Sequence, residues 1–129
     1  MEKTRNIGID RIHFYAPKMY LDLEDLATVR NTDVNKFKIG IGQEKMAIIS
    51  PNEDIVTMAA EAAFPILQGQ ENDIGLLLFA TESGIDYSKA AGIYLHALLG
   101  LNSHCRVLEV KQACYAATGA LQLAKDYVL

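Results

Sequence analysis

The stretch Ile74-Gly75-Leu76-Leu77-Leu78-Phe79-Ala80 indicates the fold class, because it is apolar along its whole length and does not alternate with polar residues. A strand of this kind is covered on both faces, as in parallel sheets whose crossover helices lie above and below. Further strand patterns occur at residues 6–15, 45–49 and 106–110, judged by their β-branched and apolar content. We therefore expect a layered sheet with helices on both sides.

Helical patterns fill the intervals between these strands. Asp22 can cap the first helix, Ser88 is the expected cap of the third, and Gly100 is its stop signal. Pro65 is expected to kink or shorten the last turn of the second helix. The four expected ranges are residues 22–27, 53–67, 88–99 and 113–124. Alternation of strand and helix predicts a mainly parallel or mixed α/β sheet.

The fourth helical pattern, residues 113–124, is small or apolar nearly all round. A helix of this composition is normally buried in the middle of a protein. Gly119 lies inside it, and close packing is the usual reason for a glycine in a helix interior. We therefore expect this helix to be surrounded by other elements.

Composition narrows the class of protein. The chain has 129 residues, half of them apolar and 22% charged, which is the size and composition of one globular domain. A net charge of -4 argues against nucleic acid and against a polybasic membrane anchor. No apolar stretch reaches the roughly 18 residues of a membrane-spanning helix. Two cysteines, Cys105 and Cys114, form no disulfide framework or metal-binding motif, which fits a reduced, cytosolic setting without a metal.

Cys114 is the candidate nucleophile. It lies where the polar pair Lys111-Gln112 gives way to the fourth helix. The free N–H groups and the dipole at a helix N-terminus favour a thiolate and can hold a developing oxyanion. On spacing alone, a buried structural cysteine that packs as a small apolar residue is the commoner case.

Glu82 is the candidate acid or base. It follows the apolar strand directly, in Phe79-Ala80-Thr81-Glu82-Ser83-Gly84. Ligands of open α/β sheets usually bind at the carboxyl ends of the strands. A partly desolvated carboxylate there has the raised pKa that proton transfer needs. The alternative is a solvated turn, which is the more common location of a loop carboxylate.

Four blocks together resemble a known family. They are residues 7–10 with 14–17, residues 33–37 (Asp-Val-Asn-Lys-Phe) with 39–43, residues 80–83 around Glu82, and residues 109–118 around Cys114. They resemble bacterial 3-hydroxy-3-methylglutaryl-CoA synthase, a family of the thiolase superfamily. The resemblance implies an α/β, thiolase-like layered fold, of which residues 1–129 are the N-terminal part.

The resemblance also implies an acyltransferase reaction of the mevalonate pathway. Cys114 would carry an acetyl group from acetyl-CoA, and Glu82 would promote its condensation with acetoacetyl-CoA to give 3-hydroxy-3-methylglutaryl-CoA. Asp33 and Val34 match positions that contact the CoA moiety in the family. The CoA thioesters are substrates, so no cofactor is expected. A homodimer in the cytoplasm is implied as the state of the complete enzyme.

One departure from the family concerns histidine. The family uses a substrate-pocket histidine that lies well beyond the nucleophile, whereas His13, His96 and His104 all precede Cys114. We therefore expect the isolated chain to be inactive, and poorly soluble or associated.

Two other functions stay open: a ketoacyl-acyl-carrier-protein synthase III-like enzyme, which pairs its cysteine with His and Asn, and a non-catalytic, truncated partner subunit. Glu82 in register with Cys114 favours the synthase.

Overall fold

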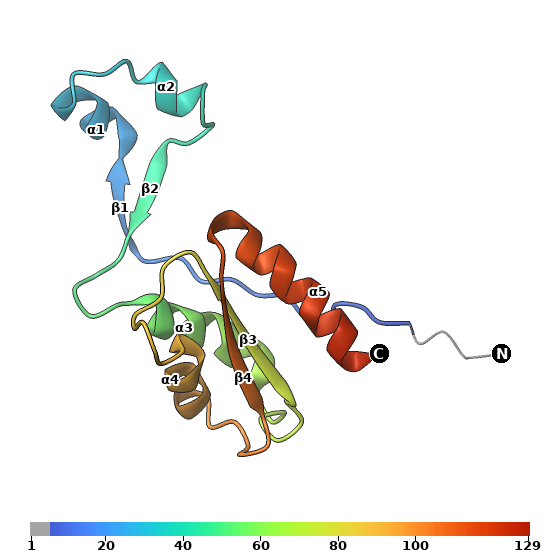
Figure 1. Cartoon of the computed structure of the whole chain (residues 1–129). Coiled ribbons are helices and arrows are strands. Elements are labelled where there is room, and N and C mark those ends of the chain that lie inside the picture. The colour runs from blue at the N-terminus through green and yellow to red at the C-terminus, as the bar shows by residue number, and fades with distance from the viewer. Residues whose placement is uncertain (1–5) are drawn as a thin grey trace. The chain divides into compact units, whose positions relative to one another are not determined.

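A computed structural model describes residues 6–129, which form two compact units. The hairpin unit is Tyr15–Asp54. The sheet unit is Ile55–Leu129 together with residues 6–14. Figure 1 shows the elements of both units.

Two parallel strands form the centre of the sheet unit. β3 (Leu76–Thr81) pairs with β4 (Arg106–Lys111), in a register that runs from Leu76 opposite Arg106 to Thr81 opposite Lys111. In Figure 1, α3 (Ile55–Leu67) and α4 (Ala91–Leu98) lie on one side of the strands and α5 (Ala116–Val128) lies on the other. The predicted parallel crossover with helices on both sides is confirmed.

The core of the sheet unit lies between the strands and the α3–α4 pair. Phe79 of β3 is 7% exposed and Leu95 of α4 is 4% exposed. Gly92 lets α4 approach the strands closely, because a Cβ atom there would lie 2.7 Å from Val107 Cγ1 and 3.2 Å from Phe79 Cβ. The buried members of this cluster are Val56, Ala60, Phe79, Ala91, Leu95, Leu99, Leu101 and Cys105.

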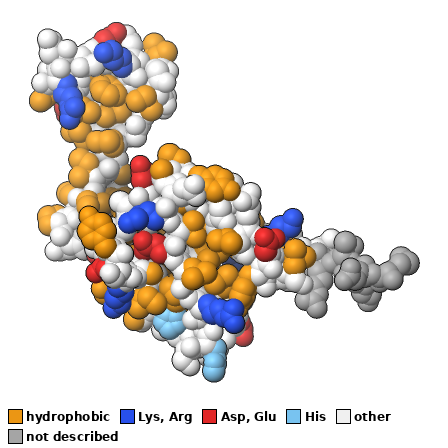
Figure 2. All heavy atoms as spheres, viewed as in Figure 1, with side chains coloured by type: hydrophobic (Ala, Val, Ile, Leu, Met, Phe, Trp, Pro, Cys, Tyr) orange, Lys and Arg blue, Asp and Glu red, His pale blue; other side chains and the backbone are white. Residues whose placement is uncertain are grey.

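The opposite face of the strands is more open. Leu108 of β4 is 53% exposed, and in α5 only Ala116 and Ala120 are buried. Within residues 6–129, the fourth helix is therefore not surrounded by other elements. Gly119 does meet a close neighbour, since a Cβ atom there would lie 3.1 Å from Cε1 of the Tyr115 ring. Figure 2 shows apolar side chains, coloured orange, open on the surface.

The hairpin unit is built on two antiparallel strands. β1 (Met19–Asp22) pairs with β2 (Lys45–Ile48), and the segment between them carries α1 (Leu23–Val29) and α2 (Asn35–Lys38). Asp22 caps α1 as predicted, because its Oδ1 accepts the N–H of Glu24 at 2.9 Å. Leu23 and Ala27 are the buried residues of α1.

Three sequence predictions of local structure are wrong. Residues 6–15 form no strand, because they are mostly exposed and lack the hydrogen-bonded neighbour strand that a ladder requires. Ser88 does not cap α4, whose N-cap is Ala90; instead the Ser88 N–H donates to Asp86 Oδ1 at 2.6 Å. The fourth helix begins with a 3₁₀ turn (η1, Ala113–Tyr115) rather than as α-helix. The 3₁₀ turn, the α2 helix and the β1 strand were not anticipated.

Candidate active site

The parallel register brings the segments of Glu82 and Cys114 to one end of the strand pair. Thr81 and Lys111 are opposite each other at the carboxyl ends of β3 and β4. Glu82 follows Thr81 directly, and Cys114 lies just beyond Lys111. Because both strands end at the same edge, both chain segments leave the sheet there. Both side chains are exposed in this structure.

Cys114 occupies the middle of the η1 turn. Its neighbour Ala113 has a φ of 43°, in the left-handed region that costs a residue with a side chain roughly 1–2 kcal/mol. Such strained residues cluster at functional sites. The N–H of Tyr115 donates to Gln112 O at 3.1 Å and closes the turn. Cys114 thus lies ahead of α5, exposed at a tight turn, where the sequence led us to expect the buried helix start itself.

The second thiol, Cys105, has the opposite environment. It is 8% exposed and belongs to the core cluster. Burial raises the pKa of the Cys105 thiol, which disfavours the reactive thiolate. Both cysteines are free thiols. Of the two, Cys114 is therefore the one that solvent can reach.

The loop that carries Glu82 is ordered by short-range hydrogen bonds. Thr81 Oγ1 donates to Ser83 O at 2.9 Å. Asp86 Oδ1 accepts the N–H groups of Ser88 and Lys89. These two donors, that of Lys89 first, lower the pKa of Asp86. Glu82 itself is exposed, so the partial desolvation predicted for it is not found in this chain.

A recess lies beside this loop. It has a volume of about 380 Å³ and is lined by residues 83–87 together with Lys111 of β4. The Lys111 ammonium lies 5.9 Å from the centre of the Tyr87 ring. Sequence reasoning did not single out Lys111 or Tyr87. The available signal was the position of Lys111 at a parallel strand end, next to the segment that carries Cys114.

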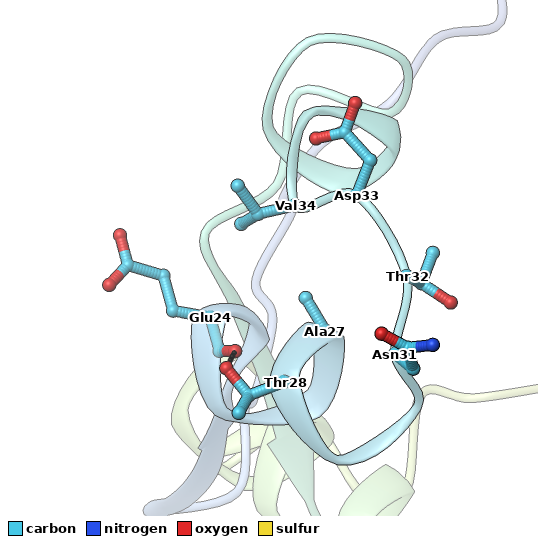
Figure 3. A pocket seen from close by; sticks show the side chains of 7 residues that line it. All are labelled: Glu24, Ala27, Thr28, Asn31, Thr32, Asp33 and Val34. Atoms are coloured by element: carbon cyan, nitrogen blue, oxygen red, sulfur yellow. Dashed lines mark hydrogen bonds between the residues drawn. The ribbon is translucent and has the colours of Figure 1, made fainter.

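Asp33 and Val34 lie in the hairpin unit, where they line a hollow of about 720 Å³. Figure 3 shows its seven labelled residues: Glu24, Ala27 and Thr28 come from α1, and Asn31, Thr32, Asp33 and Val34 follow α1 and lead into α2. The Asp33 carboxylate accepts the N–H of Asn35 at 2.9 Å. The structure thus brings Asp33 and Val34 together in one hollow, in a different unit from Glu82 and Cys114.

His96, a histidine of α4, has a hydrogen-bonding partner, and the helices can be checked for membrane-spanning length. His96 Nε2 lies 2.9 Å from Asn102 O, which gives this ring a backbone partner within the α4–β4 connection. Within residues 6–129, no helix is both long and apolar enough to cross a membrane.

Comparison with known proteins gives consistent matches along the chain. A family model described as hydroxymethylglutaryl-coenzyme A synthase N terminal matches residues 3–128. The hydroxymethylglutaryl-CoA synthase of Enterococcus faecalis is 50% identical over 123 residues, which are 95% of this chain and 32% of that protein. A polyketide biosynthesis 3-hydroxy-3-methylglutaryl-ACP synthase of Bacillus subtilis (strain 168) is 40% identical over 126 residues, covering 95% of this chain and 30% of that protein.

Solved structures agree with these relatives. A crystal structure of an HMG-CoA synthase complexed with CoA aligns with a TM-score of 0.88 and 41% identity, over 94% of this chain and 31% of that one. MvaS in complex with 3-hydroxy-3-methylglutaryl coenzyme A aligns with a TM-score of 0.85 and 37% identity, over 94% of this chain and 30% of that one. The chain therefore spans about a third of the length of the relatives that it matches.

Proposed function

The chain belongs to the hydroxymethylglutaryl-coenzyme A synthase N-terminal family, with the thiolase-like fold that its sequence predicts, and from this we propose that it supplies the nucleophile-bearing part of such a synthase. The proposed reaction condenses acetyl-CoA with acetoacetyl-CoA to 3-hydroxy-3-methylglutaryl-CoA. The observation that carries the proposal is the parallel register, in which Thr81 lies opposite Lys111. It supports joint action of Glu82 and Cys114 at one strand end.

Cys114 performs the first step of the proposed mechanism. Its thiolate attacks the acetyl carbonyl of acetyl-CoA, the CoA thiolate leaves and takes up a proton, and an acetyl thioester forms on Cys114. A covalent intermediate of this kind divides one difficult reaction into two easier ones. Exposure of Cys114 in the η1 turn supports this role, since an incoming thioester must reach the sulfur.

Glu82 performs the second step. Its carboxylate removes a proton from the methyl group of the acetyl thioester, and the resulting enolate carbon attacks the ketone of acetoacetyl-CoA. The new alkoxide takes up a proton, and water then cleaves the thioester to Cys114, which releases the product and regenerates the thiol. Exclusion of water by the complete enzyme would strengthen Glu82 as a base.

The hollow around Asp33 and Val34 is proposed to hold part of the CoA moiety. It combines the apolar side chains of Ala27 and Val34 with the polar side chains of Thr28 and Thr32. Mixed linings of this kind suit a ligand with both apolar and polar parts.

We expect the Asp33→Ala variant to have a raised KM for CoA thioesters and a kcat at saturation within about threefold of wild type. This is the pattern of a group that binds the ground state and the transition state equally.

The proposal also covers the partner subunit, the pathway and the cellular location. A second copy of the synthase is the proposed partner, and exposed apolar residues of α5, namely Leu121, Leu123 and Tyr127, support an interface with further protein. We further propose that the reaction belongs to the mevalonate pathway and takes place in the cytoplasm, where thiols are kept reduced. A synthase III-like enzyme or a non-catalytic subunit has less support, because the relatives named above are all HMG synthases. An acyl-carrier protein in place of CoA has the support of the less similar relative.

The first experiment identifies the nucleophile. It uses the complete synthase polypeptide, meaning these residues followed by a second portion like that of the relatives. After incubation with acetyl-CoA and digestion, mass spectrometry should find the acetyl group on the Cys114 peptide and none on the Cys105 peptide. Acetylation of Cys105, or normal turnover of Cys114→Ser, would refute the assignment.

The second experiment separates the two steps. Glu82→Gln should still form the acetyl-enzyme but condense about 10²–10⁴-fold more slowly, the usual contribution of a general acid or base. Near-normal condensation by this variant would contradict the role of Glu82, as would a natively folded variant that cannot acetylate Cys114.

A further inference from the structure

Glu109 is a charged residue in the interior of β4, between the apolar residues Leu108 and Val110. It is the fourth residue of β4, Arg-Val-Leu-Glu-Val-Lys, and it lies opposite Phe79 of β3. Side chains alternate along a strand, and Val107 touches the α4 side, so Glu109 points to the same side. Glu109 is only partly exposed. A carboxylate in such a place is costly unless it is hydrogen-bonded.

The start of α4 provides one hydrogen bond to this carboxylate. The N–H of Ala91 donates to Glu109 Oε2 at 2.6 Å. The N-cap residue Ala90 makes no side-chain capping bond. The first N–H groups of a helix lack partners within the helix, and a negative charge is favourable there. The β4 strand thus caps α4 through Glu109.

The other carboxylate oxygen packs against the loop that carries Glu82. A Cβ atom on Gly84 would lie 2.7 Å from Glu109 Oε1, so a side chain there would force the end of the flexible Glu109 side chain to move. Gly84 is therefore the residue that lets the loop rest on the carboxylate. Glu109 touches this loop at Gly84 and binds Ala91, the first residue of α4, directly after the loop.

We propose that Glu109 is a positioning residue, which holds the Glu82 loop (residues 82–90) at a defined place on β4, the strand that leads to Cys114. The inference rests on the proposed roles of Glu82 and Cys114. Glu109 acts through the Glu82 loop and does not itself touch a substrate. A misplacement of about 1 Å between reacting groups lowers a rate by about 10²-fold, so a loosened loop slows the step that needs Glu82.

The test compares variants of the complete synthase polypeptide by hydrogen exchange and by kinetics. Glu109→Ala removes the acceptor, and exchange of residues 82–91 should become about 10- to 100-fold faster, as expected for loss of a hydrogen bond to a charged group. Exchange in α3 should not change. Glu109→Gln keeps a carbonyl acceptor of the same size and should restore slow exchange. Glu61→Ala removes an exposed glutamate of α3 and is the matched control.

The kinetic readout distinguishes positioning from general structural support. Glu109→Ala should lower kcat for condensation by about 10- to 100-fold, with the rate of Cys114 acetylation within about threefold of wild type. Glu109→Gln should recover most of the condensation rate. Gly84→Ala pushes the same carboxylate aside without removing it and should change loop exchange and condensation in the same direction as Glu109→Ala, which keeps the test decisive if Glu109→Ala folds poorly.

Three outcomes would overturn the proposal: unchanged exchange of the loop in both Glu109→Ala and Gly84→Ala, equal loss of acetylation and condensation, or Glu109→Gln as impaired as Glu109→Ala. The last would assign the effect to charge instead of position. Failure of the wild type to acetylate Cys114 would refute the proposed function separately, because the exchange measurement would still report whether Glu109 holds the loop.

Discussion

Truncation of Leu95 to alanine tests whether the α3–α4 face of the strands is the main core of the sheet unit. Leu95 is 4% exposed and belongs to the cluster that contains Phe79. The change removes about three methylene equivalents at ~0.8 kcal/mol each, or about 2.4 kcal/mol. Helix, strand and loop residues surround the vacated space, so the site cannot collapse fully and a cavity term adds to the loss. We expect the free energy of unfolding to fall by about 3–4 kcal/mol.

Urea unfolding followed by far-UV circular dichroism measures this loss. Leu98→Ala is the matched control, because Leu98 lies in the same helix but is 51% exposed. Helix propensity changes equally in both variants, and the control should lose less than about 1 kcal/mol. Equal losses for the two variants, or a loss below about 1 kcal/mol for Leu95→Ala, would show that this face is not the stabilising core.

Two further predictions concern thiol reactivity and acid sensitivity. Under native conditions iodoacetamide should label exposed Cys114 well before Cys105, whose pKa is raised by burial, and peptide mass spectrometry should find equal labelling only after denaturation. The pKa of Glu53 is lowered because the carboxylate accepts hydrogen bonds from the Tyr15 hydroxyl and the Ser50 N–H. A pKa that is lower in the folded state contributes stability above the ordinary glutamate pKa, and this is lost as pH falls through the lowered value. The Tm of Glu53→Gln should therefore lie below that of the wild type at pH 7, and the difference should vanish in acid. A Tm difference that stays the same from pH 7 into acid would refute this account.

Much of the fold could be predicted from local patterns. The unbroken apolar run around Leu77 and Phe79 predicted a covered strand, and the structure pairs it in parallel with the strand predicted at residues 106–110. Asp22 was identified as a cap because an N-cap bond spans only a few residues. The prediction that Ser88 caps α4 failed because a turn formed by the neighbouring Asp86 occupies this part of the chain. Ser88, a suitable cap by type, donates its N–H within the Asp86 turn, and α4 begins later.

The sequence by itself determined which residues share a strand end. Glu82 and Cys114 each follow a predicted strand within a few residues, and parallel pairing of those strands is enough to bring their segments to one edge. What the sequence could not determine is which residues support them. Glu109 finds its partners in Ala91 and Gly84, and these contacts arise only when α4 packs on the strands. Local periodicity and capping are encoded by near neighbours along the chain, whereas the environment of a side chain is decided by distant segments that meet only after folding.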